Sequence, residues 1–161
     1  RNSLAVLDGT ETDEQLQALG DDIFSYFGLG CRNVSKLMVP AGYSFDRFFQ
    51  CIESFGDQLM QHNKYMNNYD YHRALYLLNS EPFLTNNFLS LRQSEVLSTP
   101  VSVLHFEYYN DLKDVREKID ATASEIQCVV GAGYLPFGTS QQPGLSDYAD
   151  RVDTLEFLLN L

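Results

Sequence analysis

The chain opens with the run Asn2-Ser3-Leu4-Ala5-Val6-Leu7-Asp8, which is closed by Gly9. A short apolar run bounded by a glycine is typical of a buried β-strand. Thr12 then stands where a helix N-cap is expected, with Gln15 at the capping-box position three residues later. Apolar residues recur at helical spacing from there to Phe27, so this stretch predicts a strand over residues 3–8 followed by a helix.

The same alternation continues along the chain and sets the expected fold class. Further strands are expected at residues 34–39, 88–91, 101–106 and 126–130, and further helices at 45–61, 68–78, 110–121 and 152–161, the last of which buries one face. A long loop rich in glycine and proline lies between the strand expected at 126–130 and the helix expected at 152–161, and such loops are often functional. Strands that alternate with helices favour an α/β fold. We therefore expect a three-layer α/β/α domain around a mostly parallel sheet.

Composition is that of an ordinary globular domain and argues against several partners. The 161 residues suffice for one domain with a core, and 44% of them are hydrophobic. The net charge of −11 argues against nucleic acid and anionic membranes, because both are bound by clustered basic side chains. No apolar run is long enough for a membrane span, and no signal-peptide pattern opens the chain. We expect a cytoplasmic protein, and the start at Arg1 indicates a domain cut from a longer chain.

Cys31 is the residue that most suggests chemistry. It lies in a turn between an expected helix and strand, flanked by Gly28 and Gly30, and glycine lets backbone N–H groups approach a reacting oxygen. Arg32 and Lys36 follow closely and could favour the thiolate. The alternative is a small buried thiol, and spacing alone favours that interpretation.

The remaining cysteines and the histidines suggest no site. Cys51 lies in an expected helix and Cys128 in an expected strand, so both are expected to be core thiols. Three widely spaced cysteines form no disulfide framework, and no metal-ligand spacing occurs. His62 is expected to be solvated at a helix end, with proton transfer as the alternative. His72 and His105 are expected to lack partners.

The order of motifs resembles the catalytic domain of the aldehyde dehydrogenase superfamily. Phe27-Gly28-Leu29-Gly30-Cys31 is similar to its nucleophile region, residues 94–101 to its Glu-x-Phe-Gly-Pro segment, and Pro136-Phe137-Gly138 to its Pro-Phe-Gly-Gly stretch. Within the superfamily the chain is most similar to bacterial acyl-CoA reductases of the LuxC type. The segments that carry this likeness are residues 28–36, 62–65, 67–71 and 147–154.

This resemblance implies an oxidoreductase. Cys31 would attack the thioester of an acyl-CoA, and NADPH or NADH would reduce the resulting thioacyl-enzyme to an aldehyde. Glu95 would contact the nicotinamide ribose. The dinucleotide-binding domain, the general base and the side-chain oxyanion donor would precede Arg1, so we expect this chain alone to be inactive. The implied partners are an acyl-CoA or aldehyde substrate and further copies of the chain, as a homo-oligomer.

Two alternatives remain open. The chain could belong to a relative that oxidises a free aldehyde with NAD(P), or it could be a non-catalytic domain that keeps the fold for oligomerisation. The tyrosines at positions 65, 69, 71 and 76 could line an acyl tunnel, but aromatic residues at such spacing more often pack in a core or an interface.

Overall fold

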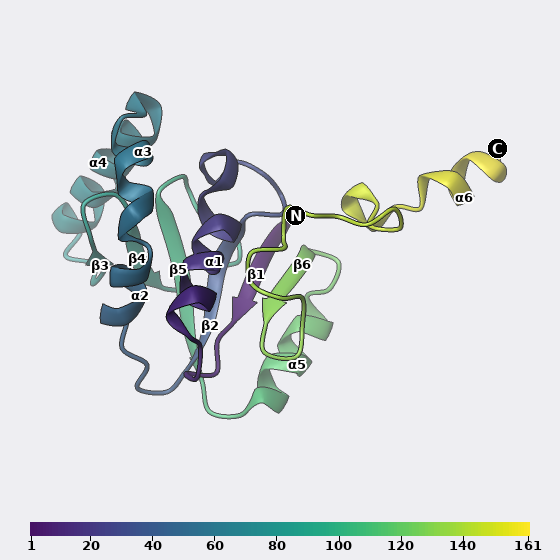
Figure 1. Ribbon diagram of the computed structural model, residues 1–161, viewed down its shortest axis with the longest axis horizontal. Helices are drawn as coiled ribbons and strands as arrows, with labels where there is room; N and C mark the ends of the chain where they lie inside the picture. Colours follow the sequence, from purple (N-terminus) through teal and green to yellow (C-terminus); the bar gives the residue numbers. More distant parts are fainter.

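The computed structural model describes the backbone of residues 1–161 and all side chains except that of Arg151. A six-stranded sheet in the order β3-β4-β5-β2-β1-β6 forms its centre (Figure 1). Its strands are β1 (Asn2–Val6), β2 (Val34–Pro40), β3 (Leu84–Thr85), β4 (Ser90–Gln93), β5 (Val103–Tyr109) and β6 (Ile126–Gly131). Every neighbouring pair is parallel except β3 and β4. The expected α/β class with a mostly parallel sheet is therefore confirmed.

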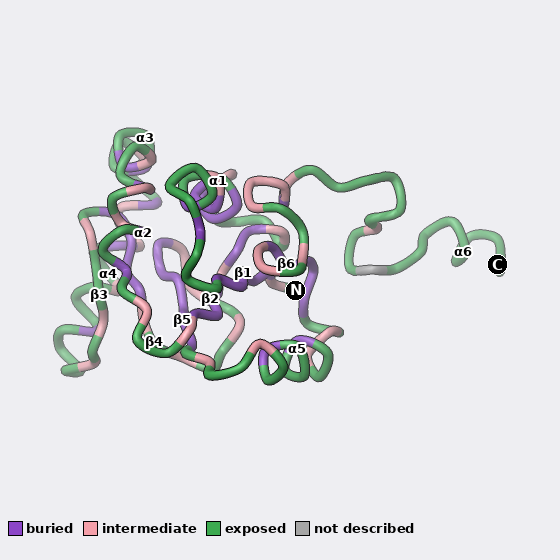
Figure 2. The backbone as a smooth tube through the Cα atoms, turned by 60° about the horizontal axis from the view of Figure 1, so that its bottom comes forward, coloured by how far each residue is buried: buried purple, intermediate pink, exposed green. Residues whose placement is uncertain are grey.

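Helices cover both faces of the sheet. They are α1 (Asp13–Phe24), α2 (Asp46–Cys51), α3 (Gly56–Met60), α4 (Asn63–Leu78), α5 (Leu112–Ala121) and α6 (Thr154–Leu159), with 3-10 turns η1 (Ser25–Gly28), η2 (Glu53–Phe55) and η3 (Ala149–Arg151). Because side chains alternate along a strand, Ala5 and Leu7 pack in the core cluster under α1, whereas Leu4 and Val6 pack against α5. Figure 2 shows the buried strands between α1 and α5. The three-layer arrangement is confirmed.

Helix α1 begins as its sequence predicts. The Thr12 side chain accepts a hydrogen bond from the Gln15 backbone N–H, and the Gln15 side chain accepts one from the Thr12 N–H. Farther along this helix, a Cβ at Gly20 would lie 2.3 Å from Cε2 of Phe55. A glycine in the middle of α1 therefore lets the Phe55 ring of η2 pack closely against it.

The prediction of one continuous helix over residues 45–61 is wrong. This stretch is divided into α2, η2 and α3, because the backbone leaves the helical path at the fully buried Ile52. The next helix begins at Asn63 rather than at Asn68, since His62 caps it by accepting the Tyr65 N–H on Nδ1 at 3.2 Å.

The last helix does not bury one face, which corrects the expectation for residues 152–161. Helix α6 lies at the end of an arm that extends away from the sheet (Figure 1). The arm exposes its large apolar side chains, which are Val152, Leu155, Phe157, Leu158, Leu159 and Leu161. Among the residues described, no helix is long and apolar enough to cross a membrane.

Candidate functional site

Cys31 lies in a tight turn at the edge where the parallel strands β1, β2 and β6 begin. The backbone N–H of Asn33 donates to the carbonyl of Gly30 at 3.0 Å, which closes a four-residue turn. Cys31 and Arg32 occupy its two central positions, and neither has a positive φ. A hydrogen-bonded turn of this kind is type I.

The side chain of Asn33 holds this turn against the end of helix α1. Its Oδ1 accepts the backbone N–H of Gly30 at 2.8 Å, and its Nδ2 donates to the carbonyls of Asp22, Ile23 and Ser25 at 3.2, 3.2 and 2.8 Å. Carbonyls at the end of a helix have no partner within the helix, so a buried amide that reaches them is stabilising. The position of Cys31 is therefore fixed by Asn33 two residues away.

The chain reaches Cys31 through a left-handed turn. Tyr26, Phe27 and Gly28 have φ angles of 53°, 58° and 74°. This conformation costs a residue other than glycine roughly 1–2 kcal/mol. The ring of His62 stacks on Phe27 with 3.9 Å between centroids, which helps to hold the turn. Backbone strain of this kind clusters at functional sites.

The Cys31 thiol is exposed, so the alternative of a small buried thiol does not apply to it. Within the described part of the chain, its Sγ has no hydrogen-bond partner, and neither do the backbone N–H groups of Cys31 and Arg32. Cys51 is partly buried and Cys128 is buried, and burial raises the pKa of both thiols. Of the three cysteines, Cys31 is the most exposed.

The long loop after β6 is anchored beside the Cys31 turn. The buried carboxylate of Asp22 accepts the backbone N–H groups of Gly138 and Ser140 at 2.7 and 2.8 Å. Burial raises the pKa of Asp22, although these hydrogen bonds act in the opposite direction. The guanidinium of Arg32 donates to the Ser140 carbonyl. The fold thus brings Pro136-Phe137-Gly138 next to the turn, although more than a hundred residues separate them.

Lys36 does not serve as a partner for the thiolate, which corrects that expectation. Its ammonium is buried and donates to the Glu107 carboxylate at 2.6 Å and to the Glu95 carbonyl at 2.8 Å. Glu107 is also paired with Lys118 from helix α5. Burial acts to raise the pKa of Glu107, but the hydrogen bonds from Lys118 and Lys36 outweigh it and lower that pKa.

Glu95 lies in the loop that connects β4 to β5, and its side chain is exposed. Among the described residues, no contact joins its carboxylate to Cys31. The loop is held by its backbone: Lys36 binds the Glu95 carbonyl, and Ser35 Oγ donates to the Leu97 carbonyl at 2.7 Å. His105 Nδ1 lies 2.8 Å from the Val96 carbonyl, so the expectation that His105 lacks a partner is wrong.

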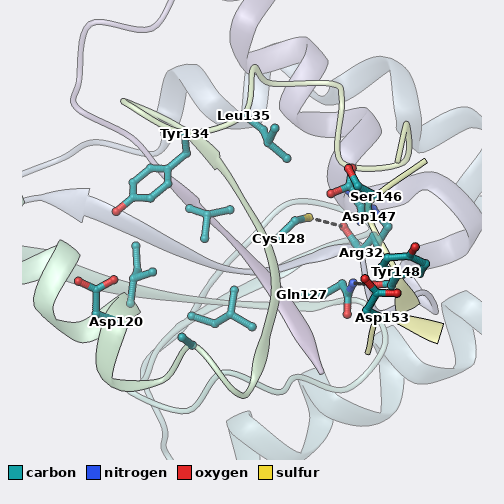
Figure 3. Close-up of a pocket in the computed structure, with 14 residues that line it drawn as sticks. Arg32, Asp120, Gln127, Cys128, Tyr134, Leu135, Ser146, Asp147, Tyr148 and Asp153 are labelled. Carbon is teal, nitrogen blue, oxygen red and sulfur yellow. Dashed lines mark hydrogen bonds between the residues drawn. The ribbon is translucent and has the colours of Figure 1, made fainter. Parts of the chain in front are cut away.

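A cavity of about 480 Å³ borders the turn along the outer strand β6 (Figure 3). It is lined by Arg32, Gln127 and Cys128 and by the segment that leads to the C-terminal arm, and Figure 3 shows Arg32 and Gln127 beside that segment. Gln127 Nε2 donates to the Tyr148 carbonyl at 3.2 Å. The Cys128 thiol points toward the Arg32 backbone (Figure 3).

A second cavity, of about 330 Å³, lies where β1 and β6 end. Open α/β sheets bind dinucleotides at such an edge, with the pyrophosphate at a helix N-terminus. Here Asp8, Glu11 and Glu14 line the cavity next to the start of α1. Their negative charges would repel a pyrophosphate, so this edge does not fit a dinucleotide.

Ser3 and Asn33 are contributors that sequence reasoning missed. Ser3 is completely buried, and its Oγ donates to the Cys31 carbonyl at 3.0 Å. The available signal was a serine directly before the apolar part of a buried strand, since a buried hydroxyl needs a partner. Asn33 gave a comparable signal, as a polar residue directly before a buried strand.

Fold and site together define a class, an α/β domain that presents an exposed thiol on a fixed turn at the amino edge of its sheet. No protein-family model matches the chain, and no curated protein matches it. Among the solved structures that are similar are a point mutant of 1-pyrroline-5-carboxylate dehydrogenase from Thermus thermophilus and the Thermus enzyme with bound NAD. Each is 11% identical with a TM-score of 0.47, over 74% of this chain. The chain spans 29% of the length of either structure. Likeness at this level concerns chain topology alone.

Proposed function

We propose that this chain is the catalytic domain of an NAD(P)H-dependent acyl-CoA reductase, with Cys31 as its nucleophile. The observation that carries the proposal is the exposed Cys31 thiol on a turn fixed by Ser3 and Asn33. A nucleophile must be accessible and must also be held in one geometry, since misplacement by 1 Å can cost about a hundredfold in rate. The motif order around Cys31 supplies the reaction class.

The thiolate of Cys31 attacks the carbonyl carbon of the acyl-CoA thioester, and the oxygen becomes an oxyanion. The unpartnered N–H of Cys31 donates to that oxygen, because a developing charge is stabilised best by donors already in place. The intermediate collapses, CoA leaves as a thiolate, and the acyl group stays on Cys31 as a thioester. After reduction, the thiohemiacetal releases the aldehyde and restores the Cys31 thiolate.

The nicotinamide cofactor, when bound, supplies the hydride for this reduction. The described residues fit one contact with it: the exposed Glu95 carboxylate can accept hydrogen bonds from the ribose hydroxyls. Lys36 would hold that loop in place through the Glu95 carbonyl at 2.8 Å. The acidic cavity at the other edge does not fit the pyrophosphate, so we propose that other parts of the protein bind most of the cofactor.

The test is turnover by the full-length protein with octanoyl-CoA and NADPH or NADH. We expect oxidation of the cofactor to depend on the acyl-CoA and to be lost in Cys31→Ala. Cys51→Ala serves as the matched control, because Cys51 lies on helix α2 outside the turn, and it should retain activity. NAD(P)-dependent oxidation of octanal without any reaction of octanoyl-CoA would point instead to aldehyde oxidation. Full activity of Cys31→Ala would exclude Cys31 as the nucleophile.

A further inference from the structure

Ser3 is a polar residue buried within the first strand, at an irregularity of the sheet. The register of β1 shifts at this point against both neighbours, between Ser3 and Leu4 with β2 and between Asn2 and Leu4 with β6. The Ser3 hydroxyl has no exposed surface. Its Oγ accepts the Cys128 N–H at 3.2 Å and lies 3.1 Å from the Cys128 thiol. Since it also donates to the Cys31 carbonyl at 3.0 Å, it joins β6 to the turn.

The carbonyl side of the turn is therefore held against the sheet. Ser3 Oγ reaches the carbonyl of Cys31, and the Cys128 sulfur lies 4.0 Å from the carbonyl of Arg32 (Figure 3). A type I turn is one turn of a 3-10-like helix, in which carbonyls point one way along the axis and N–H groups the other. Holding both carbonyls on the sheet thus directs the N–H groups of Cys31 and Arg32 away from it, beside the thiol.

We propose that Ser3 is a positioning residue for Cys31, and that the N–H groups of Cys31 and Arg32 together receive the oxyanion. This inference rests on the proposed function and specifies how the same site stabilises its intermediate. The Ser3 hydroxyl fixes the tilt of the peptide that joins Cys31 to Arg32. That peptide carries the second of the two N–H donors, so its tilt decides where that donor points.

Two reactions of the Cys31 sulfur differ in whether they form an oxyanion. Alkylation by iodoacetamide displaces iodide at a saturated carbon and forms no oxyanion. Acylation by S-phenyl thioacetate forms the Cys31 thioester, releases thiophenolate and passes through an oxyanion. Removal of the Ser3 hydroxyl should therefore slow acylation, because it misplaces the N–H donors, and should spare alkylation.

The experiment measures both rates at Cys31 by peptide mass spectrometry in the full-length protein. We expect Ser3→Ala to slow acylation at least about tenfold and to change alkylation by less than about twofold. Ser35→Ala is the matched control, because its hydroxyl binds the carbonyls of Ser3 and Leu97 and does not contact the turn. Both rates should stay within about twofold of wild type in that variant.

The decisive quantity is the ratio of the acylation rate to the alkylation rate. If Ser3→Ala leaves this ratio unchanged, including by an equal loss of both rates, the role of Ser3 is overturned. If Ser3→Ala does not fold, Cys128→Ala replaces it, and the same ratio must fall at least about threefold. Failure of the proposed function gives a different result, in which wild-type Cys31 is acylated neither by S-phenyl thioacetate nor by octanoyl-CoA. A wild-type protein that is acylated but does not respond to either substitution contradicts only the role of Ser3.

Discussion

Asn33 Nδ2 donates to the Ser25 carbonyl at 2.8 Å and so joins the end of helix α1 to the turn that carries Cys31. The same side chain accepts the Gly30 N–H on its other end. One buried amide thus determines both how the helix ends and where the thiol lies. These hydrogen bonds explain how a turn with an exposed thiol is held in place.

Replacement of Asn33 by alanine should lower the free energy of unfolding by about 2–4 kcal/mol, because buried partners lose their hydrogen bonds. Urea denaturation measures this change. Asn68→Ala is the matched control: its amide makes one solvent-facing hydrogen bond to the Lys64 carbonyl, so the loss there should stay below about 1 kcal/mol. Equal losses in the two variants would contradict the structural role of Asn33.

The left-handed turn before Cys31 predicts a gain in stability. Tyr26 is 72% exposed with a φ of 53°, so Tyr26→Gly removes strain and little packing. We expect the free energy of unfolding to rise by about 0.5–1 kcal/mol, since glycine adopts this conformation without a clash.

Tyr71→Gly is the comparison for this prediction. Tyr71 is also exposed, but it lies within helix α4, where glycine should cost about 1 kcal/mol. The two substitutions should therefore have opposite signs in thermal denaturation. A loss of stability in Tyr26→Gly would show that the turn is not left-handed at this residue.

The buried pair between Lys36 and Glu107 predicts a dependence of stability on pH. The pKa of Glu107 is lowered below its ordinary value of 4.5. A carboxylate with a lowered pKa in the folded state stabilises the protein above its unfolded pKa. This contribution is lost as the pH falls below 4.5 and passes through the folded pKa.

Glu107→Gln should accordingly lower the free energy of unfolding by about 3 kcal/mol at neutral pH, because Lys36 is left buried without its partner. The difference in the free energy of unfolding between Glu107→Gln and wild type should shrink as the pH falls below 4.5. Glu117→Gln, which breaks the exposed pair with Lys113, should cost less than about 0.5 kcal/mol. A difference for Glu107→Gln that is independent of pH from about 7 to about 3 would contradict this account.

Local sequence signals predicted the parts of the fold that depend on neighbours in the chain. The capping box of Thr12 and Gln15 and the apolar strand runs are signals of this kind, and the structure confirms them. Gly56 is different, because a Cβ there would lie 2.8 Å from the Phe88 ring. Glycine is required at position 56 because of a contact between segments distant in the sequence, and hydrophobic periodicity does not reveal such a contact. The prediction of a half-buried helix at residues 152–161 was wrong, because the local pattern is helical but no other part of the described chain packs on its apolar side chains.

The candidate site was predictable in part. The glycines around Cys31 predicted a turn, but spacing alone favoured a buried thiol there, whereas the structure places the thiol at the surface. The roles of Ser3 and Asn33 arise only when β1 and α1 are folded against the turn, across 28 residues in the case of Ser3. Lys36 looked close to Cys31 in sequence, but strand β2 directs its ammonium to Glu107 instead.

The most direct test of the central claim is the site at which an acyl group becomes attached. The full-length protein is incubated with octanoyl-CoA in the absence of NADPH and NADH, then digested and mapped by mass spectrometry. One octanoyl thioester is predicted, on Cys31, which disappears in Cys31→Ala and persists in Cys51→Ala. No acyl adduct on Cys31, or an equal adduct on Cys51, would contradict it.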